Sequence, residues 1–191
     1  PGMAYNAITV GGYNNNNTGE NYEDDYLENY SWKNSYLDMH GCEKPDVIMP
    51  SNFPGGGTSV GTPALAACIA LMIELKPSLS LSPEEVKAIV LASCHRKVIQ
   101  TSSQGGQETM SQGITERQGA GAPDIWTMVC IVSQGTYGSG IHNGTTRNID
   151  IVQPVYNSNN INFSLTWLTE TMATGDHSND SQVSSSEKYD L

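Results

Sequence analysis

A run of small and apolar residues, entered from three glycines, constrains this chain more than any other feature. Residues 55–67 read GGGTSVGTPALAA, and the apolar run continues as CIALMIEL to residue 75. Pro63 fits the first turn of a helix, where a missing N–H costs little, and Pro77 cannot continue one. The run therefore predicts a helix that begins near Ser59 and ends before Pro77. Because it is apolar on every face, we expect protein to surround it.

Two strands and two further helices are predicted around this run. AYNAITVGGY (4–13) reads as a strand meeting a turn, and KPDVIMP (44–50) reads as a short buried strand between prolines. Ser82-Pro83-Glu84-Glu85 fits a capping box and starts a helix that ends near Cys94. GAGAPDIWTMVCIV (119–132) is a glycine turn followed by a third helix. The polar stretches 14–38 and 99–118 are predicted to be surface loops.

The character of the chain changes after about residue 134. TRNIDIVQPVY and NINFSLTWL alternate apolar and polar residues, as half-buried antiparallel strands do. In the second stretch the inward positions would be Ile161, Phe163, Leu165 and Trp167. We place a domain boundary at residues 134–146, which separates a domain over 1–134 from a β-rich segment over 146–191. Residues 171–188 are polar and predict a loop.

Charge excludes some partners. The 191 residues carry 9 Lys and Arg against 20 Asp and Glu, a formal net charge of −11. Nucleic acids and anionic membrane surfaces need clustered cations, so neither is an expected partner. No stretch approaches the roughly 20 apolar residues of a spanning helix, so no membrane segment is expected. Both ends lie directly beside strand-like sequence, which indicates a piece of a longer protein.

Metal and disulfide chemistry have little support in the sequence. The four cysteines, Cys42, Cys68, Cys94 and Cys130, form no CxxC pair, so free thiols are expected and a zinc site is not. The acidic cluster of Glu20, Glu23, Asp24, Asp25 and Glu28 could ligate calcium, but it lacks the spacing of an EF-hand loop. We interpret this cluster as a solvated loop and expect no metal and no cofactor required for catalysis.

Ser59 stands where a glycine loop becomes a helix, and this position suits a nucleophile. A serine hydroxyl needs a base to take its proton and donors to hold the oxyanion that forms on the substrate. The first N–H groups of a helix have no intrahelical partner and the helix dipole favours negative charge there. A helix-capping role also fits, because serine caps helices routinely. A phosphate-binding loop does not fit, since no lysine follows the glycines.

Several stretches together resemble the subtilisin-like serine peptidases (subtilases). GTSVGTPALAACIALM resembles the family's serine motif and its helix. AYNAITVGGY, YSWKNS, KPDVIMP, LSPEEVKAIVLAS and GAGAPDIWTMV are similar to further family landmarks, in the family's order over residues 4–132. The family has P-H after the serine where this chain has Pro63-Ala64, and the loop over 51–57 is shorter than in many members.

The resemblance implies an α/β fold with a mostly parallel sheet, helices on both faces, and the start of an accessory antiparallel β-sandwich. It implies a serine endopeptidase in which Ser59 attacks the scissile carbonyl, and its N–H is an oxyanion donor. Thr58 would line the pocket and Gly57 would border the substrate. In the family the orienting Asp, the base His and the oxyanion Asn precede the serine. The histidines present, His40, His95, His142 and His177, do not match the family's base.

The upstream catalytic groups are therefore expected in a missing N-terminal part of the same chain, and this piece alone is expected to be inactive. Peptides or proteins would be the substrates, and the whole enzyme would be extracellular or attached to the cell surface. Two alternatives stay open. One is a subtilase-like scaffold used for binding or assembly without catalysis, and the other is an extracellular binding module.

Overall fold

The computed structural model describes residues 6–18, 24–31, 44–52, 56–95, 98, 115, 117–139 and 164–166. Its larger sheet has three strands in the order β2-β1-β3, namely β1 (Val10–Asn14), β2 (Tyr26–Leu27) and β3 (Val47–Pro50). β1 and β3 are parallel, with Val10 opposite Val47, whereas β2 is antiparallel to β1. Both predicted strands are present, but β1 begins only at Val10 and continues through Gly11 and Gly12, where the sequence predicts a turn.

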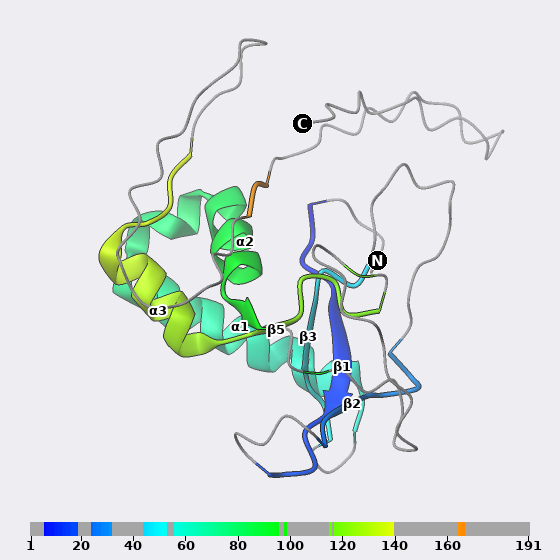
Figure 1. Ribbon diagram of the computed structural model, residues 1–191. Coiled ribbons are helices and arrows are strands. Elements are labelled where there is room, and N and C mark those ends of the chain that lie inside the picture. Colours follow the sequence, from blue (N-terminus) through cyan, green and yellow to red (C-terminus); the bar gives the residue numbers. More distant parts are fainter. Residues whose placement is uncertain are drawn as a thin grey trace, which may run out of the picture.

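The helices follow β3 in the sequence and lie together on one side of the β1–β3 pair (Figure 1). They are α1 (Thr58–Leu75), the 3-10 turn η1 (Pro77–Leu81), α2 (Pro83–Ala92) and α3 (Ile125–Gln134). α1 packs against β1, β3 and α3, and α3 also packs against α2. A small antiparallel pair, β4 (Cys94–His95) and β5 (Ala122–Pro123), joins the end of α2 to the start of α3. The chain is thus α/β, as expected.

Helix ends lie where the local signals predicted them, with one correction. α1 ends at Leu75, just before Pro77, and α2 begins with Ser82 at its N-cap and Pro83 in its first position. The Ser82 side chain makes no capping hydrogen bond, so the predicted capping box does not form. α3 is capped by a side chain: the Asp124 carboxylate accepts a hydrogen bond of 2.9 Å from the Thr127 N–H.

The main core lies between the β1–β3 pair and the three helices. It is made of buried aliphatic, methionine and cysteine side chains, which include Val47, Met49, Leu65, Met72, Leu79, Ile89, Val90, Cys94 and Met128. Strand residues alternate between this core and a second, smaller cluster on the other face of the sheet, where Ile48 packs with Tyr13 and Leu27. The sheet therefore has apolar contacts on both faces.

The predicted burial of α1 is not seen in the described part of the chain. Buried positions on α1 are Gly61, Leu65 and Met72, while Leu71 and Leu75 are 54% and 55% exposed. β3, β1 and α3 cover one side of the helix, and no described element covers the other. With a mean hydropathy of 1.6 over 18 residues, α1 is also long and apolar enough to cross a membrane, contrary to the expectation from sequence. Core helices of soluble proteins have the same composition.

One loop prediction and one strand prediction need correction. The polar stretch 14–38 contains the strand β2, and Asp25 beside it is buried with 1% exposure rather than solvated. Among residues 164–166, Ser164 donates to the carbonyl of Ala88 and Thr166 to that of Glu84, so their side chains face α2. Leu165 between them is 57% exposed. The polar residues here therefore face the protein and the leucine faces outward, the reverse of the predicted pattern. The rest of the proposed β-rich segment lies outside the described residues.

Candidate active site

Ser59 lies in the first turn of α1, with its side chain exposed. Gly57 is the N-cap, with φ 104° and ψ 160°, a conformation that L side chains rarely adopt. Gly56 before it also has a positive φ, of 53°. The two glycines therefore let the chain leave the loop after β3 and enter the helix within two residues. Thr58 is the first helical residue and is partly exposed.

The first turn of α1 presents its N-terminal backbone to solvent beside the Ser59 hydroxyl. A Cβ built on Gly57 would lie 3.5 Å from Ser59 Oγ, so this hydroxyl lies close to the Gly57 backbone. The Val60 N–H donates to the Gly57 carbonyl at 2.9 Å, and the Thr62 hydroxyl donates to the Thr58 carbonyl at 2.8 Å. No acidic residue lies in this first turn, so the partial positive charge of the helix end is not neutralised by the helix itself.

A buried ion-pair cluster holds the start of β3, the strand that precedes α1 and Ser59 in the sequence. Asp46 Oδ2 lies 2.6 Å from Lys44 Nζ and accepts from the Thr9 N–H at 2.7 Å, while Asp46 Oδ1 lies 3.0 Å from Lys87 Nζ. Lys44 is buried and also donates to the Ala7 carbonyl at 2.9 Å. One carboxylate therefore joins the start of β1, the start of β3 and the helix α2.

The histidine that the structure describes is His95, on β4. Its charge acts on Asp124, the cap of α3, so it interacts at the start of α3 rather than at the start of α1. Burial opposes ionisation of Asp124, but hydrogen bonds from Thr127 and from the Trp126 backbone, together with His95, outweigh it and lower the pKa of this carboxyl. His40, His142 and His177 lie outside the described residues. That none of the four histidines is the base remains a prediction.

Asp25 is the feature that sequence reasoning missed most clearly. Neither of its carboxylate oxygens has a hydrogen-bond partner, although the side chain is buried. Burial, and then the charge of Asp24, raise the pKa of Asp25 to about 6. Within the described part of the chain no group of three potential metal ligands is found, and Glu20 and Glu23 lie outside it. No signal in the sequence distinguishes Asp25 from its acidic neighbours.

The three cysteines in the described part of the chain form no disulfide, as expected, and the Cys94 thiol donates to the Val90 carbonyl at 3.3 Å. Cys94 is buried, and Cys68 and Cys130 are half-buried. Burial raises the pKa of the Cys68 thiol, which keeps it in its less reactive protonated form. Cys42 lies outside the described residues.

Comparisons with known proteins identify the family of this chain. Residues 1–121 match the Subtilase family. Serine protease AprX of Bacillus subtilis (strain 168) is 29% identical over 115 residues, an alignment that covers 47% of this chain. The same alignment covers 25% of that protease, so the chain spans about a quarter of the length of this curated relative.

Proposed function

This chain belongs to the subtilase family of serine peptidases, and we propose that it carries the nucleophile of a serine endopeptidase, Ser59. The observation that carries the proposal is the exposed Ser59 side chain in the first turn of α1, two residues after the positive-φ glycine at the N-cap. This geometry leaves the hydroxyl accessible to a peptide. It also leaves backbone N–H groups beside the hydroxyl without an intrahelical acceptor.

In the proposed reaction, Ser59 Oγ bonds to the carbonyl carbon of the scissile peptide as a base removes the hydroxyl proton. The carbonyl oxygen becomes an oxyanion, which the Ser59 N–H stabilises together with the positive end of the helix dipole. Thr58 borders the same pocket, and Gly57 lies along the substrate. When the tetrahedral intermediate collapses, the amine leaves with a proton and Ser59 remains as an ester. Water then hydrolyses this acyl-enzyme, which restores the hydroxyl.

The base, the aspartate that orients it and an asparagine donor to the oxyanion are proposed to come from a part of the protein that precedes this chain. The length comparison supports this proposal, because the alignment covers a quarter of the AprX protease. Alone, the chain is then inactive. We further propose that the complete domain has a mostly parallel sheet with helices on both faces, and that a β-sandwich follows from about residue 146. Extracellular or cell-surface location is proposed from the family alone.

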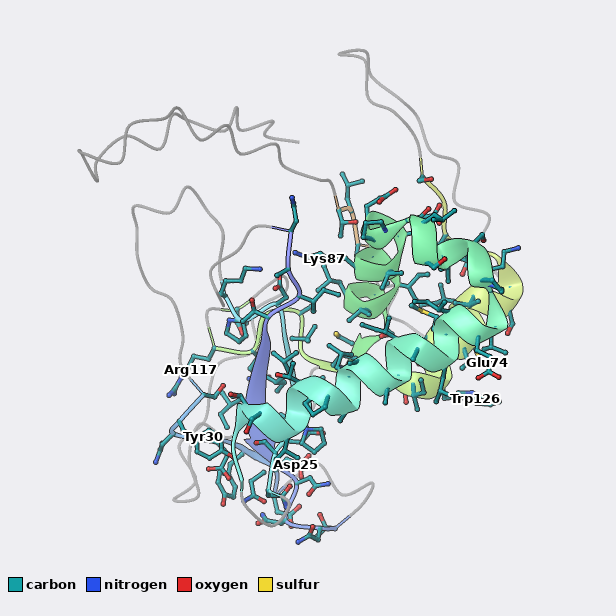
Figure 2. The ribbon with its side chains drawn as sticks, turned by 180° about the vertical axis from the view of Figure 1, so that it is seen from behind. Asp25, Tyr30, Glu74, Lys87, Arg117 and Trp126 are labelled. Atoms are coloured by element: carbon teal, nitrogen blue, oxygen red, sulfur yellow. The ribbon has the colours of Figure 1, made fainter. Side chains whose placement is uncertain are left out.

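The exposed side of α1 supports the same arrangement. Leu71 and Leu75 lie on α1, and each is more than half exposed. Trp126, which Figure 2 labels, is 72% exposed and lies on α3, which packs against α1. An apolar surface of this kind on a soluble domain marks a contact with other protein. We propose that the preceding part of the catalytic domain covers it, so that α1 becomes the enclosed helix that its composition predicts.

Fluorophosphonate labelling of the longer protein that contains this chain tests the proposed activity. The probe phosphonylates activated serines, and mass spectrometry of the digested protein locates the tag. We expect the tag on Ser59 and its loss in Ser59→Ala. Ser82→Ala is the matched control, because Ser82 also begins a helix, before Pro83, and its side chain makes no capping bond. A folded protein that takes no tag at Ser59 would overturn the proposal and favour the scaffold alternative.

A further inference from the structure

Tyr30, which follows β2, contacts the residue that follows β3. The Tyr30 hydroxyl oxygen lies 2.8 Å from the Ser51 hydroxyl oxygen and 3.2 Å from the Ser51 carbonyl oxygen. The Ser51 hydroxyl donates to the Tyr13 carbonyl at 3.2 Å, so the Tyr30 hydroxyl is the donor toward Ser51. Ser51 is completely buried and its N–H also donates to the Tyr13 carbonyl, at 2.9 Å. Ser51 is therefore held by Tyr13 on β1 and by Tyr30 in the turn that follows β2.

The same Ser51 holds the N-cap of the helix that carries Ser59. Its carbonyl accepts a hydrogen bond of 3.2 Å from the Gly57 N–H, and the Gly57 carbonyl accepts one of 2.9 Å from the Val60 N–H. The connection thus runs from the Tyr30 hydroxyl through Ser51 and Gly57 into the first turn of α1. In Figure 2, Tyr30 lies near that end of the helix.

Backbone conformation explains why the N-cap needs such support. Gly56 and Gly57 both have positive φ values, 53° and 104°, and glycine has the widest choice of conformations of any residue. The N-cap of α1 has no side-chain hydrogen bond of its own. The Ser51 carbonyl therefore restrains the residue two positions before Ser59, and the Tyr30 hydroxyl in turn restrains Ser51.

We propose that the Tyr30 hydroxyl and Ser51 are positioning residues for the nucleophile, because they hold Gly57 and hence the direction in which Ser59 leaves the helix. The proposal rests on the proposed role of Ser59. Neither side chain touches the reacting atoms, so both act through the Gly57 backbone. A small displacement of an attacking atom lowers the rate of attack strongly, whereas it affects substrate binding much less.

The experiment uses Tyr30→Phe in the longer protein, which removes the hydroxyl and keeps the ring. We expect the rate of fluorophosphonate labelling at Ser59 to fall about tenfold, with kcat for a peptide substrate falling similarly and KM nearly unchanged. Ser51→Ala should give a similar loss, and the double variant should lose little more than either single one, because both act through one connection. Tm should change little in Tyr30→Phe, whose side chain reaches the surface, whereas Ser51→Ala removes a buried, hydrogen-bonded hydroxyl and should also lower Tm.

Tyr26→Phe is the matched control. Tyr26 accepts a hydrogen bond of 2.8 Å from the Asn14 side chain, so this variant also loses a tyrosine hydroxyl bond between β1 and β2. It leaves Ser51 untouched, and we expect labelling at the wild-type rate. Labelling at the wild-type rate in Tyr30→Phe, or equal losses in Tyr30→Phe and Tyr26→Phe, would overturn the proposal.

Hydrogen exchange separates this proposal from the proposed function. The Gly57 N–H should exchange faster in Tyr30→Phe than in the parent, whether or not the protein is a peptidase. If exchange rises but the parent protein takes no tag at Ser59, the connection exists and the proposed function is wrong. If exchange at Gly57 is unchanged while the parent is labelled, the positioning role is wrong and the function stands.

Discussion

Gly61 on α1 lies directly against Met49 on β3. A Cβ built on Gly61 would come 2.9 Å from the Met49 Cβ, closer than real Cβ atoms approach one another. The absence of a side chain at Gly61 therefore sets how near the first turns of α1 approach the parallel pair β1–β3. Because Ser59 lies two residues before Gly61, this contact also decides where the Ser59 hydroxyl lies relative to the ends of the strands.

Gly61→Ala should destabilise the protein and displace the start of α1. The added methyl group overlaps an atom attached to the β3 backbone, which cannot move aside as the tip of a flexible side chain can. We expect a loss of about 1–3 kcal/mol in the free energy of unfolding, measured in urea. Gly138→Ala is the control, since a Cβ at Gly138 would meet nothing within 4 Å. Equal stability of the two variants would contradict this interpretation.

Asp46→Asn should be strongly destabilising because it leaves buried lysine charge without its partner. Lys44 Nζ is 2.6 Å from Asp46 Oδ2, and the two side chains are 5% and 11% exposed. Removing one member of a buried pair costs roughly 3–5 kcal/mol. Substituting the lysine as well, in Lys44→Met with Asp46→Asn, should recover part of the loss. A double variant less stable than the Asp46→Asn single variant, by thermal or urea unfolding, would show that the uncompensated charge is not the cause.

Asp25 should make stability fall as pH rises. Its pKa in the folded chain is raised from 3.8 to about 6, so between these values the folded state holds a proton that the unfolded state has lost. The free energy of unfolding therefore decreases over this pH window, by at most about 3 kcal/mol. Above the window, ionised Asp25 lowers the stability by a constant amount. Asp25→Asn removes the titration, so the variant should be the more stable one at neutral pH and should match the parent near pH 4.

Urea unfolding at several pH values checks this expectation through the difference between parent and variant. Asp24→Asn is a useful second variant, because the charge of Asp24 contributes to the raised pKa of Asp25. In an Asp24→Asn background, the stability change caused by the Asp25 titration should be centred at a lower pH. A difference between parent and Asp25→Asn that does not vary with pH would show that Asp25 finds a partner for its charge.

Leu71→Lys should have different consequences in this chain and in the longer protein that contains it. Leu71 is 54% exposed here, so the substitution should change the stability of this chain by no more than about 0.5 kcal/mol. If the preceding part of the domain covers α1, the same lysine is buried there, and we expect a loss of at least about 2 kcal/mol. Leu81→Lys, at an 86% exposed leucine on η1, is the matched control. Small effects of Leu71→Lys in both proteins would contradict the proposed cover.

The local elements could be predicted from sequence because their signals lie within a few residues. Pro77 marks the end of α1, Pro83 the start of α2, and the glycines before Thr58 the turn into the first helix. The position of Ser59 in a first turn followed from the same signals. Ser82 shows the limit of this reasoning, since its side chain satisfies the pattern of a capping box without making the bond.

The tertiary structure alone decided the contacts between residues distant in sequence. The parallel register of Val10 with Val47, the approach of Gly61 to Met49 and the bond from Tyr30 to Ser51 join segments that no short-range pattern relates. The burial of Asp25 is of the same kind, because nothing in a run of acidic residues distinguishes the one that packing encloses. Sequence by itself determined where the helices begin and end and which serine stands at a helix start, since backbone hydrogen bonding and proline geometry act locally. Packing determined which side chains are enclosed and how the serine is held, since those depend on surfaces that meet only when the chain is folded.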